Sequence, residues 1–217
     1  MTGRGFFLVF EGLEGVGKTT HARSLVERLH RAGVPCRAVR EPGGTPAGER
    51  VRGVVLDPEL AISAEAELLL LLAARAELVR SVVLPALERG EVVVADRYEM
   101  STLAYQGIAR GLGEEHVKHL NEFATGGLRP DAVVLLQAPP GEGLRRKSGE
   151  ADRLERETEA FFGRVAEAYE RLARETPGVI VVDSSAGQEE VQARIVQELA
   201  GRWPETFGDA AGLPDGA

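Results

Sequence analysis

The stretch FEGLEGVGKTT, Phe10 to Thr20, decides how this chain folds. It follows directly on the apolar run at residues 6–9, and its spacing Gly12-x-x-x-x-Gly17-Lys18-Thr19 is that of a phosphate-binding loop between a strand and a helix. Glycines let the backbone curl so that several N–H groups point inward at a phosphate, and the next helix adds its positive dipole end. We therefore predict that this segment binds a nucleoside triphosphate.

Two side chains of the loop carry specific expectations. Lys18 is expected to reach the β- and γ-phosphates, and the Thr19 hydroxyl to ligate Mg²⁺. The alternative is an ordinary glycine-rich turn that caps a helix, which the strand–loop–helix context and the eight matched positions argue against. The predicted ATP-binding set is the whole loop: Gly12, Leu13, Glu14, Gly15, Val16, Gly17, Lys18, Thr19 and Thr20.

Composition limits the class of protein. The 217 residues suffice for one α/β domain with a full core, and 43% hydrophobic with 28% charged residues is typical of a globular protein. A formal charge of −8 argues against a nucleic-acid binder with a broad basic face. Cys36 is the only cysteine, so a reducing compartment is expected. The longest apolar block, residues 68–74, is too short to span a membrane, and no secretory leader is expected, so we predict a cytoplasmic protein.

Five short apolar runs predict buried parallel strands, at residues 6–10, 36–39, 92–95, 132–136 and 179–182. Segments with helical spacing lie between and after them, at residues 23–31, 64–88, 114–124, 157–174 and 189–202. This alternation predicts a three-layer α/β fold, with a five-stranded parallel sheet and helices on both faces. Residues 1–207 are expected to form one domain, and residues 208–217, rich in Gly, Ala, Asp and Pro, a disordered tail.

Reactive side chains follow the other predicted strands. REPGGT, residues 40–45, has too much Gly and Pro to be regular, and DRYEMSTLAYQG begins with Asp96 at the end of a strand. Such an acid organises Mg²⁺ in proteins with this loop, and Arg97 beside it is suited to bind a phosphate; a structural Asp–Arg pair is the alternative. The basic cluster at residues 145–156 predicts a short arginine-rich lid, although a solvated surface would look similar.

Taken together, these motifs resemble the bacterial thymidylate kinase family. The resemblance rests on GLEGVGKTT, REPGGT, AARAEL at residues 73–78, DRY with AYQG, RPD at residues 129–131 and DRLE at residues 152–155, and it covers about residues 6–200. It implies a P-loop kinase that uses ATP and Mg²⁺ to phosphorylate dTMP to dTDP for DNA synthesis. It also implies a homodimer formed through helices near residues 68–72, which are apolar on every side.

The resemblance gives roles to individual residues on the donor side. Glu14 corresponds to an acidic residue near Mg²⁺ and the acceptor, and Arg97 to an arginine that bridges the two phosphates, with Asp96 beside it. The metal set is therefore Thr19, Glu14 and Asp96. The other family subtype has an arginine in this loop; Val16 and its glycine neighbours supply none, so the lid would have to provide one. Arg153 is the expected catalytic residue there, Arg145 and Arg146 are expected to bind ATP, and Lys147 stays an alternative.

On the acceptor side, Arg75 matches an arginine that hydrogen-bonds the thymine. Leu71 stands where the family often has a phenylalanine stacked on the base, and it still offers an apolar floor. Tyr105 is the expected filter for deoxyribose, because a ring packed under the sugar leaves no room for a 2′-hydroxyl. The remaining residues expected to line the acceptor are Glu41, Pro42, Ser101, Thr102 and Gln106.

Two alternatives to this function follow from the loop alone. Another P-loop nucleoside or nucleotide kinase would share the donor side, and the AYQG stretch with Arg75 argues against it. A nucleotide-switched binding protein would need Asn/Thr-Lys-x-Asp to read guanine. None of Lys18, Lys118 and Lys147 is followed by aspartate two positions later.

Overall fold

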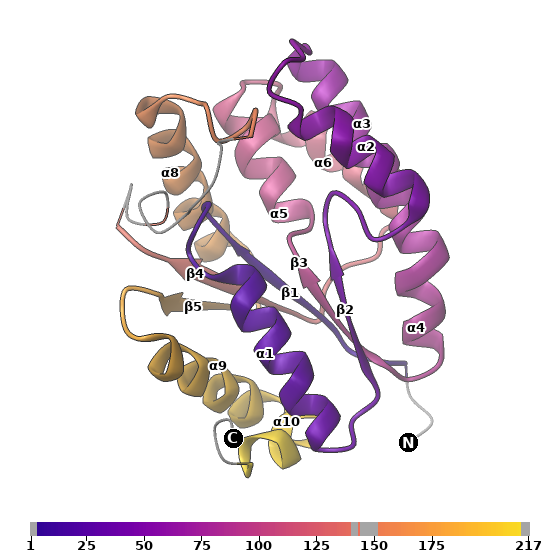
Figure 1. Ribbon diagram of the computed structural model, residues 1–217, viewed down its shortest axis with the longest axis vertical. Coiled ribbons are helices and arrows are strands. Elements are labelled where there is room, and N and C mark those ends of the chain that lie inside the picture. Colours follow the sequence, from indigo (N-terminus) through magenta and orange to yellow (C-terminus); the bar gives the residue numbers. More distant parts are fainter. Residues whose placement is uncertain (1–3, 140–142, 144–151, 214–217) are drawn as a thin grey trace.

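A five-stranded parallel sheet forms the centre of the protein, with strand order β2-β3-β1-β4-β5 (Figure 1). The computed structural model describes residues 4–139, 143 and 152–213. The strands are β1 Phe7–Gly12, β2 Cys36–Arg40, β3 Val92–Asp96, β4 Ala132–Gln137 and β5 Val179–Asp183. All five lie where the apolar runs predict them, and each runs a residue or two further than its apolar stretch. The three-layer α/β fold is thereby confirmed.

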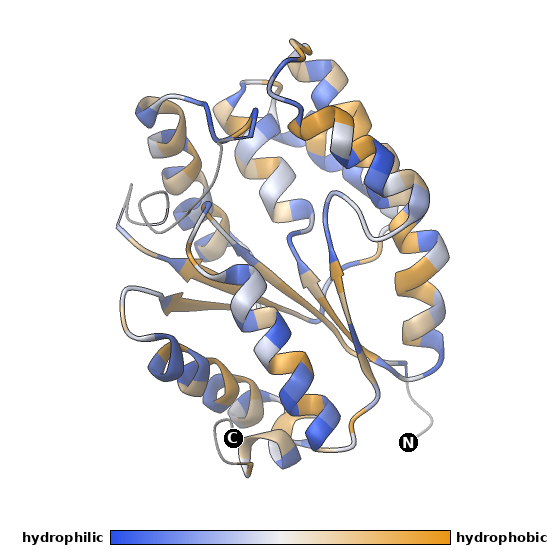
Figure 2. Ribbon diagram, viewed as in Figure 1, coloured by the Kyte–Doolittle hydropathy of each residue, from blue (hydrophilic) through white to orange (hydrophobic). Residues whose placement is uncertain are grey.

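Helices cover both faces of the sheet. On one face pack α1 Lys18–Arg31, α9 Gln188–Arg202 and α10 Pro204–Ala211; on the other lie α3 Ala64–Leu78, α4 Leu84–Glu88, α5 Glu99–Thr102 and α8 Glu159–Glu175. Successive strand residues alternate between the two cores, so Phe7 and Val9 meet one layer while Leu8 and Phe10 meet the other. The strands are accordingly apolar over most of their length (Figure 2).

The helix predicted over residues 64–88 is present but not uniform. It consists of α3, the π-helical turn η1 Val79–Val83, and α4. Pro85 explains the change, because proline lacks an N–H and its ring clashes with the carbonyl four residues earlier. The backbone widens instead, and the N–H of Leu84 bonds to the carbonyl of Val79, five residues back.

Two further helical segments were not predicted. Helix α2, Pro46–Leu56, begins at an N-cap where the Thr45 hydroxyl accepts from Gly48 N–H at 2.9 Å, and Pro46 occupies the first helical position. The DRY segment continues as α5 and the π-helical segment η2 Leu103–Ala109. The helix α6, Glu114–Thr125, follows it as expected.

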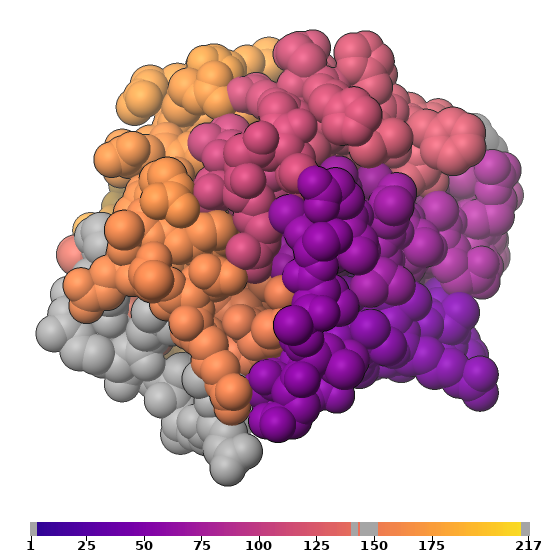
Figure 3. All heavy atoms as spheres, turned by 90° about the horizontal axis from the view of Figure 1, so that it is seen from above, coloured from indigo at the N-terminus to yellow at the C-terminus, as the bar shows by residue number. Residues whose placement is uncertain are grey.

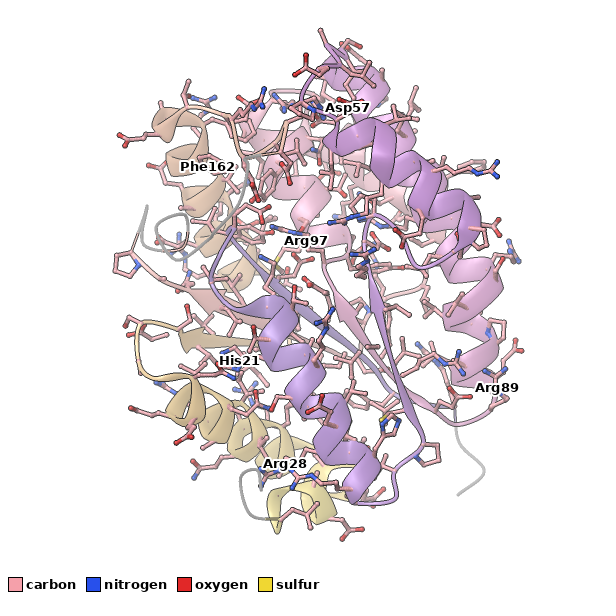
Figure 4. All side chains as sticks on the ribbon, in the orientation of Figure 1. His21, Arg28, Asp57, Arg89, Arg97 and Phe162 are labelled. Atoms are coloured by element: carbon pink, nitrogen blue, oxygen red, sulfur yellow. The ribbon has the colours of Figure 1, made fainter. Side chains whose placement is uncertain are left out.

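The segment expected to be a disordered tail, residues 208–217, begins as helix. Helix α10 includes residues 208–211, Phe207 within it is fully buried, and its ring meets Phe6 edge-on at 5.2 Å. Arg28 of α1 lies beside α10 (Figure 4) and donates to the carbonyl of Ala210 in that helix at 2.6 Å. The composition of this segment hid the few apolar positions that anchor it; residues 214–217 are not described.

No helix within the described residues is long and apolar enough to cross a membrane. Most of the predicted lid, including Arg145, Arg146 and Lys147, lies outside the residues that the structure describes. Its last part, from Asp152 to Arg156, is described, and it packs against the α2 side of the molecule. Figure 3 shows this contact as orange atoms against violet ones.

Candidate active site

A cleft of about 370 Å³ opens at the carboxyl ends of β1, β2 and β3, where parallel α/β sheets bind their ligands. The phosphate-binding loop forms one wall. Residues from β2, α3, α5 and η2 form the other. Arg97 lies between the two walls (Figure 4). The cleft thus joins the segments that the sequence singles out separately.

The loop after β1 has the shape that phosphate binding requires. Gly12, Gly15 and Gly17 have positive φ angles of 136°, 73° and 95°, which L side chains rarely adopt. A Cβ at Gly12 would lie 2.3 Å from the Leu136 carbonyl oxygen, so the loop also approaches β4 too closely for a side chain. Helix α1 begins directly after Gly17, and Lys18, Thr19 and Thr20 of its first turn line the cleft, where a helix start is suited to bind an anion.

Lys18 is a buried cation at the start of α1, with only 6% of its surface exposed. Its Nζ donates to the Leu13 carbonyl at 2.5 Å, which holds the side chain back over the loop. Burial, followed by the charge of Arg97, lowers the pKa of Lys18 to about 8, although Glu14 and Asp96 oppose the shift. An anion bound in the loop would stabilise the charged form.

Arg97 is held in a strained backbone conformation, with a φ of 75°. Its N–H bonds to the Phe10 carbonyl at 2.9 Å. The guanidinium donates to Gly12 O at 3.1 Å, to Ser101 Oγ at 2.9 Å and to Tyr169 Oη at 3.3 Å, and it forms an ion pair with Glu14. These contacts aim a fixed positive charge into the centre of the cleft.

Glu11 supports this arrangement from below. Its fully buried carboxylate accepts the backbone N–H groups of Tyr98 at 2.9 Å and Ser101 at 3.1 Å, and the hydroxyls of Ser101 and Tyr169. Burial raises its pKa, although the Ser101 hydroxyl and the Arg97 charge partly offset this effect. Glu11 therefore fixes the turn that carries Arg97, and Tyr169 links it to α8.

Asp96 and Thr19 meet at the mouth of the loop, where the Thr19 hydroxyl donates to the Asp96 carboxylate. Both line the cleft, as does Glu14. Oxygen atoms of this kind are the ligands that Mg²⁺ prefers, and Mg²⁺ is usually held by one or two carboxylates with water and phosphate oxygens completing its shell. The three predicted metal residues therefore fit such an ion.

Arg75 is the buried centre of the opposite wall, 3% exposed. Its Nε and Nη2 both meet Glu41 Oε2, at 2.7 and 2.5 Å, while Nη1 donates to Thr102 Oγ1 at 2.8 Å and to Asn121 Oδ1. These contacts use four of the five N–H groups of the guanidinium and, among the described residues, leave one on Nη2. The other Glu41 oxygen, Oε1, is buried without a partner among the described residues.

The remaining predicted acceptor residues also line the cleft. The Tyr105 ring lies under the Arg97 guanidinium, with the Arg97 Cζ atom 5.3 Å from the ring centroid, and burial raises the pKa of its phenol so that it stays neutral. Gln106 is 2% exposed, and its Nε2 donates to Glu67 Oε1 at 2.7 Å. The other cleft residues of this set are Pro42, Leu71, Ser101 and Thr102.

Arg153 lies away from this lining. Its guanidinium donates to Glu67 Oε2 at 2.5 Å and to the Val55 carbonyl at 2.7 Å, and its backbone N–H bonds to Leu56 O at 3.1 Å. Its neighbours Asp152 and Leu154 do line the cleft. The described structure thus ties Arg153 to α2 and α3, and a contact between its side chain and phosphates stays a prediction.

Comparison with known proteins agrees with this geometry. A family model described as thymidylate kinase matches residues 10–195. The chain belongs to the thymidylate kinase family. A thymidylate kinase of Symbiobacterium thermophilum is 46% identical over 214 residues, covering 96% of this chain and 99% of its own. One from Deinococcus radiodurans is 46% identical over 195 residues, covering 88% and 95%, and one from Pseudomonas fluorescens is 43% identical, covering 96% and 99%.

Family membership confirms the resemblance drawn from the motifs. Several residues that support the cleft were nevertheless not predicted from the sequence. Glu11 carried a signal, since it is a lone charge inside an apolar strand. Glu67, Asn121 and Tyr169 carried none, because each lies on a helix far along the chain from its partner. Only the fold brings them into contact with the residues that line the cleft.

Proposed function

We propose that this protein transfers the γ-phosphoryl group of ATP to dTMP. The observation that carries the proposal is the position of Arg97, which lies between the phosphate-binding loop and the wall built around Arg75. An oxygen of the dTMP phosphate attacks the γ-phosphorus, the bond from that phosphorus to the β–γ bridging oxygen breaks, and ADP and dTDP result.

The donor side holds the triphosphate through the loop N–H groups and Lys18. When bound, Mg²⁺ would neutralise negative charge on the phosphates. Thr19, Asp96 and Glu14 are the proposed residues that hold it, directly or through water. Because Glu14 also pairs with Arg97, it links the metal site to the bridging arginine.

Arg97 performs the central task, which is to bring two polyanions together. Its guanidinium contacts Gly12 at the loop and Ser101 across the cleft, so it can meet both the γ-phosphate and the acceptor phosphate. A strong general base is not needed, because a phosphate monoester has a second pKa of about 6 and is largely ionised near neutral pH. The acceptor oxygen is therefore already a nucleophile.

The acceptor wall binds the nucleoside of dTMP. Arg75 has one N–H left for a carbonyl of the base, and Leu71 offers an apolar surface beside it. Tyr105 packs under Arg97 and lines the cleft, which supports its proposed role as the deoxyribose filter. Further basic residues, Arg145, Arg146 and Arg153, are proposed to add charge from the lid.

We also propose that the protein is a cytoplasmic homodimer. The supporting observation is exposed apolar surface on two helices that pack together through Leu68, Leu72 and Val117: Leu69 of α3 is 59% exposed and Phe123 of α6 is 89% exposed. Sedimentation velocity should give the mass of a dimer, and Leu69→Glu should shift it to a monomer. Val181→Glu, at a 46% exposed position on β5, is the control and should leave the dimer intact.

The experiment that tests the activity is a coupled ADP-release assay with ATP and Mg²⁺. It compares dTMP, dUMP, dCMP, dGMP, thymidine and the ribose form of TMP as acceptors. Preference for dTMP with rejection of the ribose form supports both the activity and the Tyr105 filter. Activity on thymidine rather than dTMP would overturn the acceptor-phosphate role of Arg97, and ATP hydrolysis indifferent to acceptor would overturn the kinase itself.

A further inference from the structure

A buried carboxylate that does not line the cleft contacts a polar side chain that does. Glu67 of α3 is fully buried. Its Oε1 accepts from Gln106 Nε2 and Arg110 Nε, both at 2.7 Å, and its Oε2 accepts from Arg110 Nη2 at 3.0 Å and Arg153 Nη2 at 2.5 Å. Gln106 lines the cleft, whereas Glu67 does not.

The ionisation state of Glu67 follows from its partners. Burial alone would raise the pKa of this carboxyl, but hydrogen bonds from Arg110, Gln106 and Arg153 outweigh burial and lower it. Arg110 is itself held in place by Glu157 at 2.8 Å and by the Phe161 ring, 4.9 Å from its Cζ. Glu67 therefore remains a carboxylate at neutral pH.

An ionised carboxylate only accepts hydrogen bonds. Gln106 can meet it only with its NH₂ group, because turning the amide round would place two oxygens together. The amide is planar and carries its oxygen on the other side, so Oε1 points away from Glu67. Within the part of the chain that the structure describes, no donor meets this oxygen, and Gln106 lines the cleft. The cleft therefore receives an acceptor at this position.

We propose that Glu67 is a specificity-determining positioning residue, which fixes Gln106 so that the cleft presents an acceptor to the edge of the base. The proposal rests on the proposed function. Thymine and uracil carry an N–H at ring position 3 and a carbonyl at position 4, whereas cytosine carries a bare nitrogen and an amino group. Gln106 Oε1 suits the N–H, and the remaining N–H of Arg75 suits the carbonyl. Cytosine would place its bare ring nitrogen against the Gln106 oxygen, and its amino group against the Arg75 N–H. Neither pair forms a hydrogen bond.

The test replaces the carboxylate by an amide of the same shape, Glu67→Gln. The new amide can donate as well as accept, so Gln106 is free to turn and offer its NH₂ group to the cleft. The expected result is a fall of about tenfold or more in the ratio of kcat/KM for dTMP over dCMP, with KM for ATP unchanged. A merely structural role would lower kcat/KM for both acceptors equally, and that outcome would overturn the proposal.

Two further variants keep the test decisive if Glu67→Gln folds poorly. Gln106→Leu removes the acceptor but leaves the contacts of Glu67 with Arg110 and Arg153 in place. It should lower the same ratio. The exchange Glu67→Gln with Gln106→Glu puts an amide against a carboxylate again and returns an oxygen acceptor to the cleft, so the preference for dTMP should recover. Unchanged discrimination in Gln106→Leu would contradict the proposal.

Arg110→Lys is the matched control, since it disturbs the same cluster but keeps a positive charge beside the Glu67 carboxylate, which still orients Gln106. It should lower thermal stability without changing the ratio. Calorimetric binding of dTMP and dCMP to the wild type and to Glu67→Gln separates the two hypotheses. If the wild type binds dTMP more tightly than dCMP but phosphorylates neither, the proposed function fails, and the change of this binding ratio in Glu67→Gln still decides the role of Glu67.

Discussion

The two walls of the cleft are built in opposite ways. The donor wall is one contiguous segment, residues 12–20, and it acts mainly through backbone N–H groups at a loop and a helix start. The acceptor wall consists of side chains from β2, α3, α5 and η2, and its centre is the buried Arg75. A local segment is therefore enough to bind a triphosphate, whereas choosing an acceptor needs the whole fold.

The largest expected effect is at the donor wall. Lys18→Met removes the charge that neutralises the phosphates and should lower kcat by about a hundredfold or more, as the loss of one preorganised transition-state donor does elsewhere. Because the donor wall acts on ATP alone, the loss should be the same with dTMP and with any poorer acceptor. Steady-state kinetics with two acceptors checks this equality. A loss confined to dTMP would contradict the separation of the two walls.

Arg75→Lys should have a smaller and more selective effect. Lysine keeps the charge but cannot serve Glu41, Thr102 and Asn121 together, because it lacks the planar fork. We expect KM for dTMP to rise about tenfold to a hundredfold while KM for ATP stays unchanged, since an unsatisfied buried group typically costs about 1–3 kcal/mol. The measurement is the pair of KM values; a rise in both would show that the walls are coupled.

The third expected effect is the uptake of a proton when ATP binds. In the protein without ATP, Lys18 has a pKa of about 8, below the ordinary 10.5 of a lysine, so it loses its proton as the pH rises through 8. A bound triphosphate raises this pKa again. ATP binding should therefore weaken above pH 8, by at most about tenfold per pH unit. Calorimetry at pH 8.5 in buffers of different ionisation enthalpy counts the protons. Lys18→Arg stays charged and should take up none from this site; equal uptake would assign the proton elsewhere.

This contrast also explains what the sequence could predict. The loop, the five strands and the long helix over residues 64–88 are visible as local patterns of glycine or of apolar spacing. Helix α10 was missed because its sequence, PETFGDAA, contains one large apolar side chain, Phe207, and so shows no helical apolar period. Its stability comes from packing against α9 and Phe6 and from the Arg28 hydrogen bond rather than from propensity, which no local pattern reports.

The acceptor wall was predicted only through resemblance to a family. Nothing local connects Arg75 with Asn121, 46 residues later, or Gln106 with Glu67, 39 residues earlier. Arg153 shows the limit from the other side: its basic surroundings predict phosphate binding, yet in the described structure its guanidinium is engaged by Glu67. A charge run indicates what a side chain can bind, and the fold decides which partner it meets.

The smallest expected effect comes from Thr45, which supports the acceptor wall without lining it. Its hydroxyl caps α2 by accepting from Gly48 N–H, and it ends the REPGGT loop that carries Glu41 and Pro42. Thr45→Ala should cost about 1 kcal/mol of stability, and Thr45→Ser should restore most of it because serine caps equally well. Denaturant unfolding measures both. Since the donor wall does not depend on α2, KM for ATP should stay constant, and any rise should appear in KM for dTMP alone. A change in KM for ATP would mean that the loop after β2 also supports the triphosphate site, and the two walls would then share a framework.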